Sequence, residues 1–286
     1  LHPMAEEGKE ASGSMGDDTP VAVLSSHFRP VSHYFRQNFS QVTNPPIDSL
    51  RENKVMSLKT RFGNLGNILD FDNLTEENIY VLDSPILTNS EFNRFKKFFS
   101  KKTKELDCTF DTSSSLKDRI EEIREEAETS VREGSTCLVL TDKNISDKKA
   151  SIPSILTVGA VHSYLVKQGL RGYCSLNVEC SDALDTHSFA VLIGVGATTV
   201  NPYLAIDSIY QRFEKKLFGK SDFQSCVMKF KKSIDAGLLK IMSKMGISVI
   251  SSYRGGCNFE AVGLSRAIVS DYFPGMSSRI SGIGVI

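Results

Sequence analysis

Residues 173–204 read YCSLNVECSDALDTHSFAVLIGVGATTVNPYL, and the alternation inside this stretch decides the fold. The apolar runs Tyr173–Val178 and Ala197–Asn201 predict two buried strands. Between them, His187–Ile193 predicts a short helix that ends at Gly194. A strand that is followed by a helix and then by another strand is typical of parallel pairing with a right-handed crossover.

The same alternation extends to both sides of this stretch. Cys137–Leu140 predicts another buried strand, and helices are expected over residues 153–168 and Tyr203–Leu217. Upstream, apolar residues recur at three- and four-residue steps from Leu116 to Val131, which predicts an amphipathic helix that begins after Ser115. The sequence therefore predicts an α/β fold in which parallel strand–helix layers resemble an incomplete β/α barrel.

The flanks of the chain carry less regular patterns. Thr19–Leu24 predicts a short buried strand, and the aromatic residues of Phe28–Phe39 predict a helix face. Towards the end of the chain, apolar residues from Phe230 to Met245 share one face of a long helix. We expect Ile247–Ile250 to form the next strand and Asn258–Val262 to begin another helix.

The bulk composition excludes several classes of protein. Apolar residues make up 40% of the 286 residues and charged residues 24%, which is ordinary for a globular protein. The 34 basic and 34 acidic residues cancel, so no broad field attracts nucleic acid or an anionic membrane surface. No apolar run approaches the roughly 18 residues of a membrane helix, and no secretory signal is visible. Because the chain begins at Leu1 and not at Met, we expect its start to lie further upstream.

The six cysteines do not form a metal-binding pattern. None of them is spaced C-x-x-C, and no histidine lies at a zinc-finger interval from any of them. Cys137 and Cys174 lie in strand-like apolar runs, where a thiol behaves as a small hydrophobic group. The sequence predicts reduced, structural cysteines in an intracellular compartment.

Four blocks of sequence, in the same order along the chain, resemble the large subunit of glutamate synthases. They are Met15–Ser25; Gln41–Asp48 with Arg51-Glu52 and Met56-Ser57-Leu58; Gly196-Ala197 with Asn201–Ala205; and Gly237–Ser248 with Ser252–Gly255, Phe259–Leu264 and Ser278-Arg279-Ile280. The resemblance covers most of the chain, and four blocks in register are far more specific than any single block.

The resemblance implies a large multidomain oxidoreductase. An amidotransferase domain would release ammonia from glutamine, and a (β/α)8 barrel that holds FMN would add it to 2-oxoglutarate and reduce the product to glutamate. A 3Fe-4S cluster would relay electrons from an NAD(P)H-oxidising partner subunit or from ferredoxin. Bacterial cytosol and plastid are the compartments that fit this family.

The same resemblance divides the chain into three parts. Residues 1–14 would be a linker from the amidotransferase domain, residues 15–220 the central domain, and residues 221–286 the truncated start of the FMN-binding (β/α)8 barrel. We expect no FMN, no iron–sulfur cluster and no activity in this chain alone, because the family's catalytic cysteine, its clustered cysteines and its phosphate-binding loops do not occur in it. The alternative is a non-catalytic relic or a standalone scaffold and interaction module.

The candidate site residues follow from the expected strand at Ile247–Ile250. Active sites of such barrels lie at the carboxyl ends of the strands, so Met245, Ser248, Ser252 and Arg254 are predicted to lie near FMN or the substrate. A guanidinium suits a carboxylate or a phosphate. The alternative for Arg254 is an ion pair with Glu260 or another acidic residue.

Other motifs have plainer interpretations. Asn44-Pro45-Pro46-Ile47-Asp48 predicts a stiff connector, with a wall of the ammonia path as the alternative. The stretch Gly194–Ala197 follows a helix and lacks a third glycine, so it is a helix stop and not a dinucleotide loop.

Two histidines and one group of lysines have local interpretations. We interpret His187 as a helix-terminal residue with local hydrogen bonds, not as an acid or base, and His162 as packed or partly exposed. A group of lysines is predicted to form a solvated helix face: Lys231, Lys232, Lys240 and Lys244.

Overall fold

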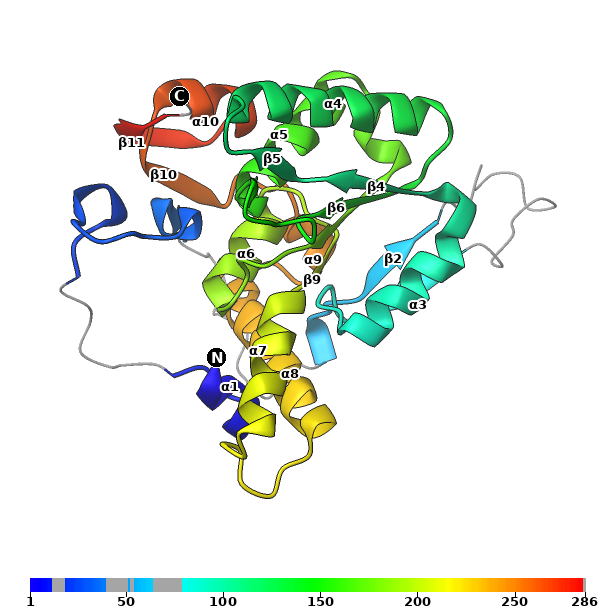
Figure 1. Ribbon diagram of the computed structural model, residues 1–286, viewed down its shortest axis with the longest axis vertical. Coiled ribbons are helices and arrows are strands. Elements are labelled where there is room, and N and C mark those ends of the chain that lie inside the picture. Colours follow the sequence, from blue (N-terminus) through cyan, green and yellow to red (C-terminus); the bar gives the residue numbers. More distant parts are fainter. Residues whose placement is uncertain (12–18, 40–50, 52–53, 64–78, 285–286) are drawn as a thin grey trace.

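The computed structural model describes residues 1–11, 19–39, 51, 54–63 and 79–284. The Asn44–Asp48 connector and most of the Met15–Asp18 part of the first family block lie outside the described residues. Figure 1 shows a parallel sheet at the centre, with α4 and α5 above it and α7, α8 and α1 gathered below.

The central sheet contains four parallel strands in the order β4-β6-β8-β9. They are β4 (Thr103–Asp107), β6 (Cys137–Thr141), β8 (Ser175–Glu179) and β9 (Thr199–Asn201). Every residue of β6 and β9 is buried, as expected for a sheet covered on both faces. Strands that follow one another in sequence are neighbours in space, so the predicted parallel strand–helix layering is confirmed.

Helices connect these strands, and most begin at a side-chain cap. Three of the predicted helices are confirmed as α4 (Leu116–Arg132), α5 (Ser154–Lys167) and α6 (Thr186–Gly194). The Ser115 hydroxyl accepts a hydrogen bond from the Asp118 amide at the start of α4, and Asp185 does the same for α6.

Two further helices flank the sheet. The helix expected at Tyr203–Leu217 is α7, which ends at Glu214 (Tyr203–Glu214). Helix α3 (Asn89–Phe99) precedes β4 and begins with a full capping box between Thr88 and Glu91.

A short antiparallel ribbon covers the carboxyl end of the central sheet. It pairs β5 (Thr109–Asp111) with β7 (Lys149–Ser151). The Cys108 amide donates to the Thr141 carbonyl, and the Ile152 amide donates to the Cys108 carbonyl. The ribbon is therefore tied directly to the ends of β4 and β6.

A second sheet brings together the two ends of the chain. Its order is β1 (Phe35–Gln37), β10 (Phe259–Leu264) and β11 (Ser277–Ile283), with β1 antiparallel and β11 parallel to β10. Helix α10 (Arg266–Tyr272) is the crossover between β10 and β11 and packs on α5. Figure 1 shows this sheet beside α4 and α5.

The predictions for the segments of this second sheet were wrong. The helix expected from Asn258 is strand β10, because pairing with β1 and β11 on both edges decides its conformation. The helix expected at Phe28–Phe39 is a 3-10 turn, η2 (Val31–Tyr34), followed by β1. The strand expected at Thr19–Leu24 is another 3-10 turn, η1 (Ala22–Leu24).

The long helix predicted around Phe230–Met245 is confirmed as α8 (Phe223–Met245), which ends at Gly246 in the left-handed conformation. The segment expected to be a linker begins with α1 (His2–Glu7), whose Met4 and Ala5 are buried against α8. The His2 ring stacks on Phe218 at 4.8 Å. The start of the chain is thus part of the packed fold.

The strand predicted at Ile247–Ile250 is not formed. Val249 makes a single parallel bridge with Ser57, and Ile250 begins a short helix, α9 (Ile250–Tyr253). A four-residue apolar run is equally compatible with a strand and with a buried helical turn. The contact with Ser57, far away in the sequence, selects the turn.

A smaller two-stranded sheet supports a separate aromatic cluster. Strands β2 (Thr60–Phe62) and β3 (Tyr80–Leu82) are antiparallel and pack on α3 through Phe62 and Phe95. Within the described ranges, no helix is long and apolar enough to cross a bilayer.

Candidate functional site

The carboxyl edge of a parallel sheet is where α/β proteins place their ligands. Here the central strands end in polar residues: Thr141 ends β6 and Asp142 follows it, Glu179 ends β8 and Asn201 ends β9. These four side chains are buried, so the chemistry of this edge depends on what pairs with them.

Glu179 is a paired buried charge. Its side chain is 2% exposed, and it accepts hydrogen bonds from Thr141 Oγ1 at 2.8 Å and from Lys143 Nζ at 2.6 Å. Lys96 Nζ lies 3.8 Å away. These donors satisfy the buried carboxylate of Glu179 within the fold.

Asp142 ties the covering ribbon to the sheet. Its Oδ2 accepts hydrogen bonds from Ser151 Oγ at 2.9 Å, from Ser181 Oγ at 2.6 Å and from the Ser181 amide at 3.1 Å. Burial, followed by the charge of Asp142, raises the pKa of the nearby Tyr203 hydroxyl. These contacts hold the turn after β8 against the end of β6.

The remaining titratable groups at this edge are not set up for catalysis. Asp182 accepts from the Ser154 hydroxyl and from the Ser154 amide, and burial raises the pKa of its carboxyl group. Burial, together with neighbouring carboxylates, raises the pKa of the Cys108 and Cys180 thiols. Both thiols are therefore protonated and unreactive near neutral pH.

The carboxyl edge is filled by its own side chains. The cavity beneath the ribbon is about 10 Å³, which is room for a water molecule and not for a metabolite. Across the described residues, no group of three or more potential metal ligands converges. Among the described residues, the ends of β6 and β8 therefore leave no room for a metabolite.

Two of the predicted site residues, Met245 and Ser248, are held by remote segments, and Ser252 is held locally. Met245 is half-buried, and its Sδ accepts a hydrogen bond from Gln37 Nε2 at 3.1 Å. The Ser248 carbonyl accepts from the Ser57 amide at 2.8 Å, while the Ser248 side chain is exposed. Ser252 is also exposed, and its amide donates to the Val249 carbonyl at 3.0 Å.

The Arg254 guanidinium donates a hydrogen bond to the turn that follows α6. Its Nε donates to the Ala197 carbonyl at 3.2 Å, and burial followed by the charge of Arg171 lowers its pKa to about 10. The alternative pairing with Glu260 is wrong, because the ion pair of Glu260 is with Arg279 at 3.8 Å.

Arg171 caps the same turn. Its Nη2 donates to the Gly196 carbonyl at 2.9 Å, and its Nη1 donates to the Cys174 carbonyl at 2.6 Å. The Gly196 and Ala197 amides bond back to Ile193 and Leu192, which is a Schellman ending with Gly196 at φ 129°. Two guanidinium groups thus stabilise the carbonyl end of α6.

The four predicted residues do not by themselves fit a flavin. The Arg254 Nε is bonded to the α6 turn, Met245 is held from β1, and the two serines present exposed side chains. These contacts lead to separate segments instead of converging on one hollow. No chemical step is derived from them.

His162 is packed, as predicted, whereas the hydrogen bond of His187 reaches a distant segment instead of a local partner. Arg171 Nε donates to His162 Nδ1 at 3.1 Å. Burial, and then the charges of Arg171 and Arg254, lowers the His162 pKa to about 4, so its ring is neutral. His187 Nε2 donates to the Ser32 carbonyl at 2.9 Å at the start of α6.

The lysine face is only partly solvated. Lys232, Lys240 and Lys244 are exposed, as predicted. Lys231 is not, because its side chain is 13% exposed and its Nζ lies 2.8 Å from Glu91 Oε1.

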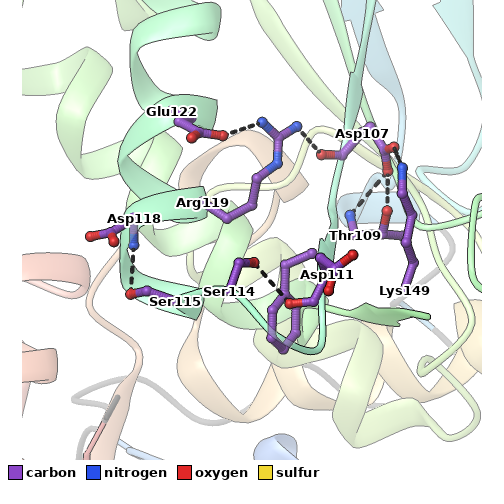
Figure 2. A pocket seen from close by; sticks show the side chains of 10 residues that line it. Asp107, Thr109, Asp111, Ser114, Ser115, Asp118, Arg119, Glu122 and Lys149 are labelled. Carbon is purple, nitrogen blue, oxygen red and sulfur yellow. Dashed lines mark hydrogen bonds and ion pairs between the residues drawn. The ribbon is translucent and has the colours of Figure 1, made fainter.

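A polar groove of about 470 Å³ lies between β5, β7 and the start of α4, and sequence reasoning missed it (Figure 2). Arg119 Nη1 donates to Glu122 Oε2 at 2.8 Å, and its Nη2 donates to the Asp107 carbonyl at 2.7 Å. Asp107 Oδ1 accepts from the Thr109 hydroxyl at 2.7 Å, and Lys149 Nζ lies 3.8 Å from Asp107 Oδ2. Two charge pairs therefore lie within this groove, Arg119 with Glu122 and Lys149 with Asp107.

Comparison with known proteins identifies the family. The model of the glutamate synthase central domain matches residues 1–265. The chain is 58% identical to the glutamate synthase [NADPH] large chain of Azospirillum brasilense over 288 residues, which cover 100% of this chain and 19% of that protein. It is 40% identical to the corresponding Bacillus subtilis large chain, over 99% of this chain and 18% of that one.

Other relatives are named for a different electron donor. The chloroplastic ferredoxin-dependent glutamate synthase of Spinacia oleracea is 39% identical over 99% of this chain and 18% of that protein. Among solved structures, a mutant flavocytochrome b2 with pyruvate bound superposes with a TM-score of 0.42 and 12% identity, over 61% of this chain and 39% of that one. A structural similarity of this size identifies no function.

The chain spans about a fifth of the length of these curated relatives. The family match covers nearly the whole chain, and the identity extends from end to end. The chain therefore belongs to the glutamate synthase family, in which it corresponds to the central domain.

Proposed function

We propose that this chain is the interdomain scaffold of a glutamate synthase large chain. The observation that carries the proposal is the 58% identity over the entire chain to a protein of which it covers only 19%. The ends of β6 and β8 support a scaffold role, because the cavity there is too small for a substrate.

The complete polypeptide makes glutamate from glutamine-derived ammonia and 2-oxoglutarate by reductive amination on FMN. Its amidotransferase domain and the remainder of its FMN barrel are the partners of this chain. A 3Fe-4S cluster passes electrons from an NAD(P)H-oxidising subunit or from ferredoxin. The relatives named for NADPH, NADH and ferredoxin support each of these donors.

The division of the chain into residues 1–14, 15–220 and 221–286 is part of this proposal. So is the placement of Met245, Ser248, Ser252 and Arg254 near FMN or the substrate. Ser248 and Ser252 support it best, because their side chains are exposed on a segment that contacts from β1 and Ser57 hold in place. Bacterial cytosol and plastid are the proposed compartments.

An assay of the full-length polypeptide that contains this sequence, together with its NAD(P)H-oxidising partner subunit, tests the proposal. We expect glutamate from glutamine and 2-oxoglutarate with NADPH, NADH or reduced ferredoxin, and two glutamates for each pair of electrons consumed. Omission of 2-oxoglutarate is the matched control and should abolish oxidation of the donor. A full-length polypeptide that oxidises none of the three donors in the presence of both substrates would contradict the proposal.

A further inference from the structure

One buried oxygen at the carboxyl edge has no partner. The Asp142 side chain is 3% exposed, and its three hydrogen bonds from Ser151 and Ser181 all go to Oδ2. Its Oδ1 is buried and accepts no hydrogen bond from the described residues, because the Tyr203 hydroxyl, which interacts with the Asp142 side chain, does not meet hydrogen-bond geometry with Oδ1. A buried carboxylate oxygen without a donor is costly, so a donor is expected beside it.

The closed cavity beneath the β5–β7 ribbon offers the space for such a donor. Its volume of about 10 Å³ is close to that of a single water molecule. Asp142 lines it together with polar groups from three other segments: Ser154, Thr157, Cys108 and Glu179. Aliphatic side chains of β6 and β8 close the rest.

The chemistry of the lining favours water over a metal ion or an empty space. Apolar cavities of this size stay dry, but a cavity with several polar neighbours fills. The two thiols in the lining are protonated, because burial raises their pKa, and a thiol is a poor metal ligand. No cluster of three potential metal ligands occurs in the part of the chain that the structure describes.

We propose that this cavity is a binding site for one water molecule, which donates a hydrogen bond to Asp142 Oδ1. Its second hydrogen has the Ser154 and Thr157 hydroxyls and the Glu179 carboxylate as acceptors. The water joins the end of β6 to the first turn of α5 beneath the ribbon. The water supplies the hydrogen-bond donor that Asp142 Oδ1 lacks. This inference does not depend on the proposed function.

A crystal structure of the protein with ordered solvent tests the site directly. We expect one fully occupied water about 2.6–3.2 Å from Asp142 Oδ1 and within hydrogen-bond reach of at least one further lining group. An empty cavity, or density that refines only as a metal cation, would overturn the inference.

The variant Val178→Ile adds a methylene group to a residue that lines the cavity. If water fills the site, the variant displaces it: oxygen-17 relaxation dispersion should count one fewer long-lived water, and the thermal midpoint should fall. If the cavity is dry, the added group fills an empty space, the midpoint rises and the water count is unchanged, which contradicts the proposal. Val161→Ile, at a buried valine of α5 outside the lining, is the control for overpacking alone.

Discussion

The two parallel-strand regions of this molecule are assembled in opposite ways. In the central sheet, each strand pairs with the next strand along the chain after a single crossover helix. In the second sheet, β10 pairs with its own successor β11 on one edge and with β1, from the other end of the chain, on the other edge. The central sheet is formed by strand–helix units that are close in sequence. The second sheet forms only when β1 meets β10, which is more than 200 residues further along the chain.

This difference decides which region is held by contacts near its own strand ends and which needs contacts from distant parts of the chain. The polar groups at the end of the central sheet pair with neighbours such as Ser151 and Ser181, a few residues from a strand end. The segment after α8 is instead positioned by Gln37, Ser57 and Ala197, each on a distant part of the chain. We expect substitutions in the first region to unfold the whole chain and those in the second to loosen it locally.

The largest effect is expected at the core of the first region. Phe189 of α6 is fully buried and packs edge-on against Phe230 of α8 at 6.4 Å. Phe189→Ala should lower the free energy of unfolding by about 3–5 kcal/mol, through lost burial and the cavity it leaves. Urea denaturation measures the change. The matched control Phe28→Ala, at a side chain that is 92% exposed, should change it by less than about 0.5 kcal/mol.

A smaller effect is expected where the two regions meet, at the end of α6. Arg171→Met removes the donors to the Cys174 and Gly196 carbonyls and should cost roughly 2–3 kcal/mol. It also removes a positive charge beside His162, so the His162 pKa should rise from about 4. Titration of the ring by NMR measures this shift. An unchanged pKa would show that burial alone holds the histidine neutral.

The pH dependence of stability should report on Asp235 of α8. Ser84 Oγ donates to Asp235 Oδ1 at 2.6 Å, and burial raises the pKa of this carboxyl to about 6, opposed by Ser84 and Lys231, with Glu91 adding to the rise. The carboxyl is protonated in the folded chain below that pH, so its contribution to stability is present at low pH and is lost as pH rises from about 4 through 6. At about 1.4 kcal/mol per pKa unit, the loss is on the order of 1–3 kcal/mol.

Asp235→Asn keeps a group that can accept from Ser84 and removes the charge. Because Asp235 lowers the unfolding free energy as pH rises, its removal should make the slope of unfolding free energy against pH between 4 and 6 more positive in the variant than in the wild type. Equal slopes in the two proteins would contradict the assignment of this pH dependence to Asp235.

The smallest effect is expected in the second region. The Tyr253 hydroxyl donates to Gln37 Oε1 at 2.7 Å, and Tyr253 is fully buried. Tyr253→Phe should cost about 0.5–1.5 kcal/mol and should speed hydrogen exchange of amides in 248–254 more than in β6 or β8. Equal acceleration of hydrogen exchange across the chain would contradict the prediction that the second region loosens locally.

The sequence predicts the first region because its signals are local. Strands β6, β8 and β9 lie in predicted apolar runs, whereas β4 is mostly polar and was not predicted. Helices α4 and α6 begin at a capping residue, Ser115 and Asp185. The second region is misassigned because FEAVGL, from Phe259 to Leu264, is compatible with a helix until its pairing with β1 is known. Likewise, Ile247–Ile250 has the composition of a strand but only one bridging partner.

The polar edge was also not predicted as a site, because Asp142 and Glu179 belong to no motif. Their only signal is position, directly after or at the end of an apolar strand. The role of Arg254 could not be deduced either, since its partner is the Ala197 carbonyl and carbonyls carry no sequence signature.

The flavin content and activity of the purified chain test the scaffold claim most directly. We predict that the 286-residue chain, incubated with excess FMN and then desalted, retains no stoichiometric flavin and forms no glutamate from glutamine and 2-oxoglutarate when a reduced electron donor is supplied. The full-length polypeptide, treated in the same way, should do both. Stoichiometric FMN on the isolated chain, or turnover by it, would contradict the account.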